Sequence, residues 1–151
     1  MSGFFGTSAA QAALSLILNN VNWANLGDAA GVLGSTAPGS VYISLHTGII
    51  APGSLQTTNE AGYTSYARVA VARTGALWTV TGPIPAQGAN ASTITFPKAT
   101  GGVESETYVA LGRDAAGGGE ILWGGPLLSP LAVSLNVQPT FPASTFVVTL
   151  G

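Results

Sequence analysis

The sequence predicts a mainly β protein: an antiparallel β-sandwich, jelly-roll or immunoglobulin-like, with about eight strands and a short N-terminal helix. Three observations support this class. The 151 residues suit one hydrophobic core, short apolar segments recur from residue 40 onward, and glycine and proline turn formers separate most of them. We expect residues 1–39 to form an N-terminal arm with the helix and a Gly/Ala/Ser connector, and residues 40–151 to form the β-sandwich domain.

The N-terminal helix is expected from residue 8 to about residue 21. Its apolar side chains recur at the i, i+3, i+4 and i+7 positions and form one stripe: Leu14, Ile17, Leu18 and Val21. Thr7 or Ser8 can cap the start of the helix, and three asparagines are expected to end it: Asn19, Asn20 and Asn22. No charged residue lies on the opposite face, so the helix is expected to dock along much of its surface.

The first predicted strand, residues 41–46, alternates with period two, and places Val41, Ile43 and Leu45 on one face. Further strands are expected at residues 66–73, 77–81, 92–96, 106–113, 120–127, 131–137 and 145–150. The hairpin signal is strongest at "DAAGGG", residues 114–119, and a turn is expected at Ser129-Pro130. Pro126 lacks a backbone donor and therefore marks a strand end or an edge strand. Residues 48–62 form a long loop, the kind of segment that often makes contacts.

The composition is poor in charge. Asp, Glu, Lys and Arg make up 7% of the chain, whereas soluble domains average about 25%. An uncharged surface is easily desolvated, which favours an assembly subunit; the alternative is a compact Gly/Thr-rich domain that is simply uncharged. The net charge is −2 and there is no basic patch, so nucleic acid is not an expected partner. The start of the chain lacks a positively charged leader, and its longest apolar run is too short to span a bilayer, so no membrane partner is expected.

Ser44 and His46, two residues apart in "SVYISLHTG", are the strongest candidate for catalysis. Alternate residues of a strand have Cα atoms roughly 6.5–7 Å apart, and parallel side chains do not easily reach the contact that a nucleophile and its base require. We therefore expect His46 to bond a neighbouring loop or face a partner subunit. No metal or cofactor site is expected, because the chain has one histidine and no cysteine. Glu104 and Glu106 are expected to be solvated.

The candidate interface residues come from the N-terminal arm and from the rare charged positions. With so few charges, each is expected to anchor a loop or lie at an interface, and Arg68 and Arg73 can pair with Glu60 or bridge subunits. The candidates are Phe4, Phe5, Leu14, Ile17, Leu18, Trp23, His46, Glu60, Arg68 and Arg73. Three tryptophans could form a sugar-stacking face, or could belong to the core or to a subunit interface: Trp23, Trp78 and Trp123.

Several strings in order resemble a family of small tailed-bacteriophage virion proteins, usually labelled phage tail fibre proteins. The strings are "VYISLHTG", "NEAGYTSYARVAV", "ITFPKATGG", "YVALGRDAAGGGEILWGGPL" and a closing "FVVTL". The resemblance covers nearly the whole chain from about Ser8. The chain departs from the family at Leu111-Gly112-Arg113-Asp114, where an apolar residue usually precedes the aspartate.

The resemblance implies a virion structural protein and names no catalytic residue or cofactor. Our leading hypothesis is a capsid decoration, or cement, protein that binds the major capsid protein on the head exterior as a homotrimer. The alternative is a tail fibre or tail-associated adsorption protein that binds a host surface glycan or protein through the loop at residues 48–62 and the tryptophans. In both cases the chain is made in the host cytoplasm, is not an enzyme, and is part of the virion.

Overall fold

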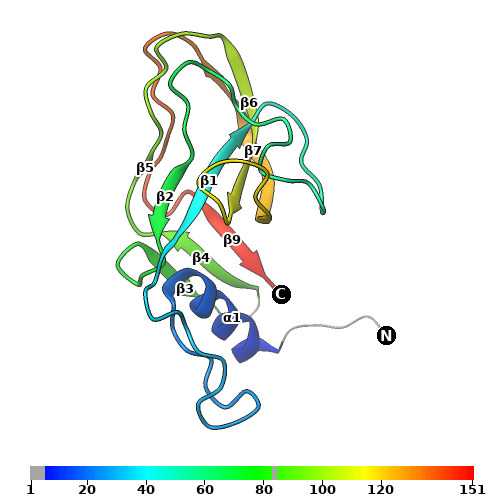
Figure 1. The fold of residues 1–151 in the computed structure, drawn as a ribbon, viewed down its shortest axis with the longest axis vertical. Helices are drawn as coiled ribbons and strands as arrows, with labels where there is room; N and C mark the ends of the chain where they lie inside the picture. The colour runs from blue at the N-terminus through cyan, green and yellow to red at the C-terminus, as the bar shows by residue number, and fades with distance from the viewer. Residues whose placement is uncertain (1–5, 83–84) are drawn as a thin grey trace. The chain divides into compact units, whose positions relative to one another are not determined.

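The computed structural model describes residues 6–82 and 85–151, and it confirms a mainly β fold with one short N-terminal helix. The described residues contain nine antiparallel strands in three sheets (Figure 1). They form two compact units. The first unit comprises the described parts of Met1–Gly39, Ala72–Thr93 and Pro142–Gly151, and the second comprises Ser40–Val71 and Ile94–Phe141. No helix in these described ranges is long and apolar enough to cross a membrane.

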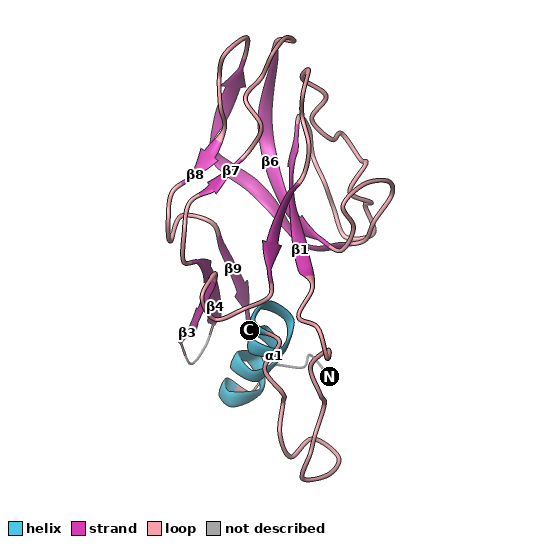
Figure 2. Ribbon diagram, turned by 60° about the vertical axis from the view of Figure 1, so that its left-hand side comes forward, coloured by secondary structure: helices cyan, strands magenta, loops and turns pink. Residues whose placement is uncertain are grey.

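The first unit packs helix α1 (Thr7–Asn19) against an antiparallel sheet in the order β3-β4-β9 (Figure 2). The strands are β3 (Trp78–Thr81), β4 (Ala86–Asn90) and β9 (Val147–Leu150). The buried face of the helix carries Leu14 and Leu18, both completely buried. Trp78 of β3 and Phe146, which directly precedes β9, pack edge to face with ring centroids 6.0 Å apart. The predicted division into an arm and a sandwich domain stays a prediction, although α1 belongs to the same compact unit as these strands.

The two ends of α1 are stabilised differently. Gly6 is the N-cap and makes no side-chain bond, so the predicted cap by Thr7 or Ser8 is wrong. The helix ends at Asn19, about two residues earlier than predicted, because Asn20 adopts the left-handed conformation with φ 57° that ends many helices. Val21 therefore lies outside the helix and is exposed, which corrects its place in the predicted apolar stripe. Arg73 Nε and Nη2 donate to the carbonyls of Ile17 and Leu16 at 2.6 and 2.7 Å. The guanidinium thus satisfies two carbonyls that the helix end leaves without partners.

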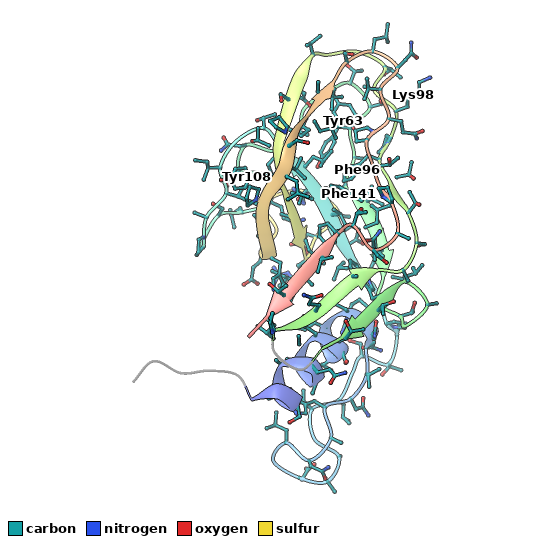
Figure 3. The ribbon with its side chains drawn as sticks, turned by 180° about the vertical axis from the view of Figure 1, so that it is seen from behind. Tyr63, Phe96, Lys98, Tyr108 and Phe141 are labelled. Carbon is teal, nitrogen blue, oxygen red and sulfur yellow. The ribbon has the colours of Figure 1, made fainter. Side chains whose placement is uncertain are left out.

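The second unit contains a four-stranded antiparallel sheet in the order β2-β1-β6-β7, except for Ala72 at the end of β2, and a small two-stranded sheet, β5-β8. The strands are β1 (Ser40–His46), β2 (Val69–Ala72), β5 (Ile94–Thr95), β6 (Glu104–Gly112), β7 (Ile121–Val133) and β8 (Thr140–Phe141). The predicted apolar face of β1 is buried as expected. An aromatic row packs within the unit: Tyr66 stacks on Phe96 at 6.3 Å, and Phe96 meets Phe141 edge to face at 6.2 Å. Figure 3 shows Phe96 and Phe141 close together.

Strand β7 corrects one prediction and confirms another. The turn expected at Ser129-Pro130 is wrong, because residues 121–133 form one continuous strand. Pairing with β6 continues to Glu104↔Val133 across a register shift between Glu106 and Tyr108. Since β7 is an edge strand, Pro126 lies at an edge as predicted. Strands β4 and β8 were not predicted.

Candidate functional site

His46 lies at the end of β1 and joins this strand to the loop at residues 48–62. Its Nδ1 lies 2.8 Å from the carbonyl oxygen of Thr58, and a carbonyl can only accept, so Nδ1 carries the proton. Nε2 then accepts a hydrogen bond from Ser44 Oγ at 2.9 Å. Burial lowers the pKa of His46 and outweighs the opposing hydrogen bond to Thr58. The imidazole is therefore neutral, and its predicted loop-anchoring role is confirmed.

The short Ser44–His46 contact corrects the expectation that two residues on one strand face do not reach each other. The two side chains lean together although their Cα atoms are separated by a full strand repeat. The pair is also completely buried, and a carbonyl rather than a carboxylate orients the imidazole. A substrate therefore has no access to Ser44 in this structure, and the hydrogen bond satisfies two buried polar groups.

Glu60 and Arg68 form the second element of the site. Arg68 Nε and Nη2 donate to the two carboxylate oxygens of Glu60 at 2.6 and 2.7 Å, so the predicted pairing is confirmed. Tyr66 Oη donates to Glu60 Oε1 and accepts from the Leu45 N–H, each at 3.1 Å. Burial raises the pKa of Tyr66. The Arg68 side chain is 3% exposed, and such a buried bidentate pair has a defined geometry that exposed pairs lack.

Arg68 also reaches the tip of the hairpin between β6 and β7. Its Nη1 donates to the Asp114 carbonyl at 2.9 Å and its Nη2 to the Gly117 carbonyl at 2.7 Å. Gln56 adds two bonds from the loop: its N–H donates to the Gly119 carbonyl at 2.8 Å, and its Oε1 accepts from the Asp114 N–H at 3.0 Å. We call His46, Gln56, Glu60 and Arg68 the loop anchor. It attaches the loop at residues 48–62 to both β1 and the hairpin tip.

Glu106 is not solvated, which corrects the prediction, and Glu104 is half-buried. The Glu104 carboxylate accepts the N–H groups of Tyr63 at 2.8 Å and Gly62 at 3.0 Å. Glu106 is completely buried. Burial, and then the neighbouring Glu104 carboxylate, raise the pKa of Glu106 to about 8. Glu106 is thus mainly protonated at neutral pH. In the described part of the chain, no group of three or more side chains is suited to hold a metal ion.

Beyond the anchor, the exposed residues of the loop are uncharged, and two of them are large and apolar. Ile49 is 69% exposed and Leu55 is 48% exposed. Between this loop and the start of β7 lies a pocket of about 440 Å³. It is lined by Ile50, Ala51, Pro52, Gly53, Ser54, Ile121, Leu122, Trp123 and Gly124. None of these residues is charged, so the pocket would favour a neutral ligand.

The remaining predicted interface residues lie in the first unit. Leu14 and Leu18 belong to its core, Ile17 and Trp23 are half-buried, and Arg73 bonds the end of α1. Phe4 and Phe5 lie outside the described residues. A role for any of these side chains at an interface stays a prediction. Gln56, Tyr66 and Glu104 were not predicted as site residues. The string "NEAGYTSYAR", residues 59–68, contains Tyr66 and was the nearest sequence signal for that residue.

Comparison with protein families identifies the family of this chain. Residues 7–149 match the family described as podophage GP4 fiber I protein gp80. The chain belongs to this family. It is a phage fibre protein and therefore a component of the virion, and the resemblance to phage tail fibre proteins is confirmed. The family description supports the fibre alternative better than capsid decoration. No curated protein matches the chain.

Proposed function

We propose that this fibre protein contacts the host surface during adsorption through the outer side of the loop at residues 48–62. The observation that carries the proposal is that the loop anchor fixes a loop that exposes two large apolar side chains, Ile49 and Leu55. A fixed contact loop loses less conformational entropy on binding than a mobile one. The role is structural and non-enzymatic, in keeping with the fibre family.

The electrostatics of the loop also support the proposal. Glu60 is the one ionisable residue between positions 48 and 62, and Arg68 neutralises it inside the unit. A surface without charges can be buried against a partner without the large desolvation penalty that an unpaired charge carries. Ile49 and Leu55 then supply apolar area to the contact.

We further propose that the fibre consists of several copies of this chain, with a homotrimer as the expected form. Four exposed apolar side chains on the first unit support self-association: Val21, Leu26, Val32 and Leu33. Closed rings of identical subunits are the common way for a chain to bury such a surface. Light scattering of the purified chain should give a trimer mass, and Leu33→Asp should reduce it to the monomer mass. A monomer at all concentrations would contradict the proposal.

Host contact is tested by binding the purified chain to host cells and by competition with phage adsorption. Ile49→Asp and Leu55→Asp should each abolish cell binding, because a charge enters the apolar contact. Val103→Asp is the matched control, since Val103 is equally apolar, even more exposed and outside the loop. Equal loss of binding in the control, or none in the loop variants, would contradict the loop as the contact surface.

Copy number in purified virions separates a fibre position from the head exterior. If the fibre is the proposed homotrimer, each virion should contain a small multiple of three copies of this chain. Hundreds of copies would instead support the capsid decoration hypothesis. Quantitative mass spectrometry of intact particles gives this copy number.

A further inference from the structure

We propose that Glu104 and Glu106 share one proton, which acts as a pH-sensitive latch on the end of the loop at residues 48–62. The two side chains are neighbours on one face of β6, because alternate residues of a strand point to the same side. The residue between them is exposed, as this alternation requires. The inference goes beyond the proposed function, since it concerns the attachment of the loop and does not require host contact.

Glu104 connects β6 to the turn that ends the loop. Its carboxylate accepts the Gly62 N–H at 3.0 Å and the Tyr63 N–H at 2.8 Å. Tyr63 is buried, and its hydroxyl donates to the Pro97 carbonyl at 3.0 Å. N–H groups bond more strongly to an ionised carboxylate than to a neutral acceptor. The turn is therefore held best while Glu104 is the charged member of the pair.

Glu106 has the opposite surroundings. It is completely buried, and neither of its carboxylate oxygens meets a hydrogen-bond donor among the described residues. Apolar Leu131 lies opposite it on β7, and the titratable groups beside it are Glu104 on its own strand and Tyr63 in the turn. A buried carboxylate without a donor or a cation carries a large desolvation penalty. Glu106 is therefore the member that keeps the proton.

A carboxylic acid beside a carboxylate provides the missing donor. Protonated Glu106 has an O–H group that donates to the Glu104 carboxylate, whereas two ionised carboxylates in contact would repel each other. Burial, the hydrogen bond with Glu104 and the charge of Glu104 together raise the pKa of Glu106 to about 8. The proton is thus held at neutral pH and lost in mild alkali.

Loss of the proton should release the turn. Two negative charges then lie side by side, and only the half-buried Glu104 side chain can move toward water, because Glu106 is enclosed. When Glu104 moves, the N–H groups of Gly62 and Tyr63 lose their acceptor. The loop anchor contains neither carboxylate, so we expect the release to be confined to the end of the loop.

The test is an NMR titration of the full chain from pH 6 to 9.5. It follows the side-chain carboxyl ¹³C signals of Glu104 and Glu106 and the amide ¹H signals of Gly62 and Tyr63. We expect all four signals to change in one transition near pH 8, because one proton controls them. Each pH unit above the transition should lower the ratio of latched to released chain about tenfold.

Glu106→Gln should keep the latch closed, because its side-chain amide donates to Glu104 and has no proton to lose in this range. The Gly62 and Tyr63 amide signals of this variant at pH 9 should remain those of the parent chain at pH 6. Glu120→Gln is the matched control. It makes the same change at a glutamate whose side chain is 65% exposed, and it should leave the transition unchanged.

Three results would overturn the inference. If the Glu106 carboxyl titrates while the two amide signals stay constant, Glu106 is an isolated acid that does not control the turn. If the transition persists in Glu106→Gln, another group causes it. If calcium chloride shifts these signals in a saturable manner at pH 8, a metal ion rather than a proton balances the two carboxylates. Should Glu106→Gln fail to fold, the titration of the unaltered chain, with and without calcium, still decides.

Discussion

Glu60 and Arg68 form a two-pronged ion pair inside the second unit, with N–O distances of 2.6 and 2.7 Å. The same guanidinium donates to the carbonyls of Asp114 and Gly117. One side chain thus connects the long loop to the hairpin between β6 and β7, and the position of the loop depends on Arg68.

Removal of the guanidinium should therefore destabilise the second unit. In Arg68→Ala the Glu60 carboxylate loses its partner, and two carbonyls lose their donors. Breaking a buried pair on one side typically costs about 3 kcal/mol, so we expect a loss of that order in urea unfolding. Arg68→Lys should restore only part of it, because an ammonium group cannot make the planar two-pronged contact.

Arg113→Ala provides the control for this prediction. The Arg113 side chain is 65% exposed and lies 3.6 Å from Asp114 and 3.7 Å from Glu120. Exposed pairs of this kind contribute at most about 1 kcal/mol, so stability should hardly change. A similar loss in both variants would show that Arg68 has no special structural role.

Because of His46, the folded chain should lose stability in mild acid. Burial holds the pKa of His46 below its usual value of 6.5, so the unfolded chain binds a proton more readily than the folded chain. Stability should therefore be full above about pH 6.5 and should decrease as the pH falls toward the lowered value. The proton must bind Nε2, which breaks the hydrogen bond from Ser44.

Urea unfolding at a series of pH values measures this effect. His46→Gln cannot titrate and should show a smaller decrease in stability from pH 6.5 downward, whatever its stability at neutral pH. An unchanged slope in the variant would mean that another group causes the acid sensitivity.

The elements that were predicted correctly have strong local patterns. The 3.6-residue spacing of Leu14 and Leu18 indicates α1, and the alternation around Ile43 indicates β1. Strand β4, Ala86–Asn90, has no β-branched or aromatic residue, and its pairing with both β3 and β9 provides a stability that no local pattern reports. The turn predicted at Pro130 failed because an edge strand tolerates a residue without an N–H.

The part of the candidate site built from charged residues was predictable, because the chain has few of them. With six acids and four bases in the chain, a pairing of Glu60 with Arg68 follows from a short list. Gln56 could not be found in this way, since its role depends on the hairpin tip that folds against it. The Ser44–His46 contact was missed because Cα spacing does not determine how far two side chains lean together.

Glu106 should give the stability of the chain the opposite pH dependence at higher pH. Its pKa is about 8 in the folded chain, well above the usual value of 4.5, so the folded chain holds a proton that the unfolded chain has lost. Stability should therefore decrease as the pH rises from about 4.5 to about 8. Well above pH 6.5, where His46 is neutral in both states, Glu106 should dominate the slope.

Glu106→Gln tests this assignment. Glutamine is neutral at every pH and close in shape, so the variant should lose the decrease between pH 6.5 and 8 and should be more stable than the parent chain at pH 8. Glu104→Gln should also lower the pKa of Glu106, since it removes the neighbouring negative charge. A parent chain whose stability stays constant across this interval would contradict the buried, protonated state of Glu106.

The contact between α1 and β4 requires a glycine at position 88. An added Cβ at Gly88 would lie 2.2 Å from Leu18 Cδ1 and 3.3 Å from Val148 Cγ2. Leu18 is completely buried, so it cannot move without disturbing the core. Gly88→Ala should therefore destabilise the first unit by roughly 1–3 kcal/mol, the usual effect of overpacking. Gly75→Ala, in the same unit with nothing within 4 Å of the added Cβ, should hardly change the stability.

A double variant tests the contact directly. Leu18→Ala combined with Gly88→Ala should lose less stability than the sum of the two single changes, because the smaller side chain leaves room for the new methyl group. Additive losses in thermal unfolding would show that the helix does not meet the sheet at Gly88.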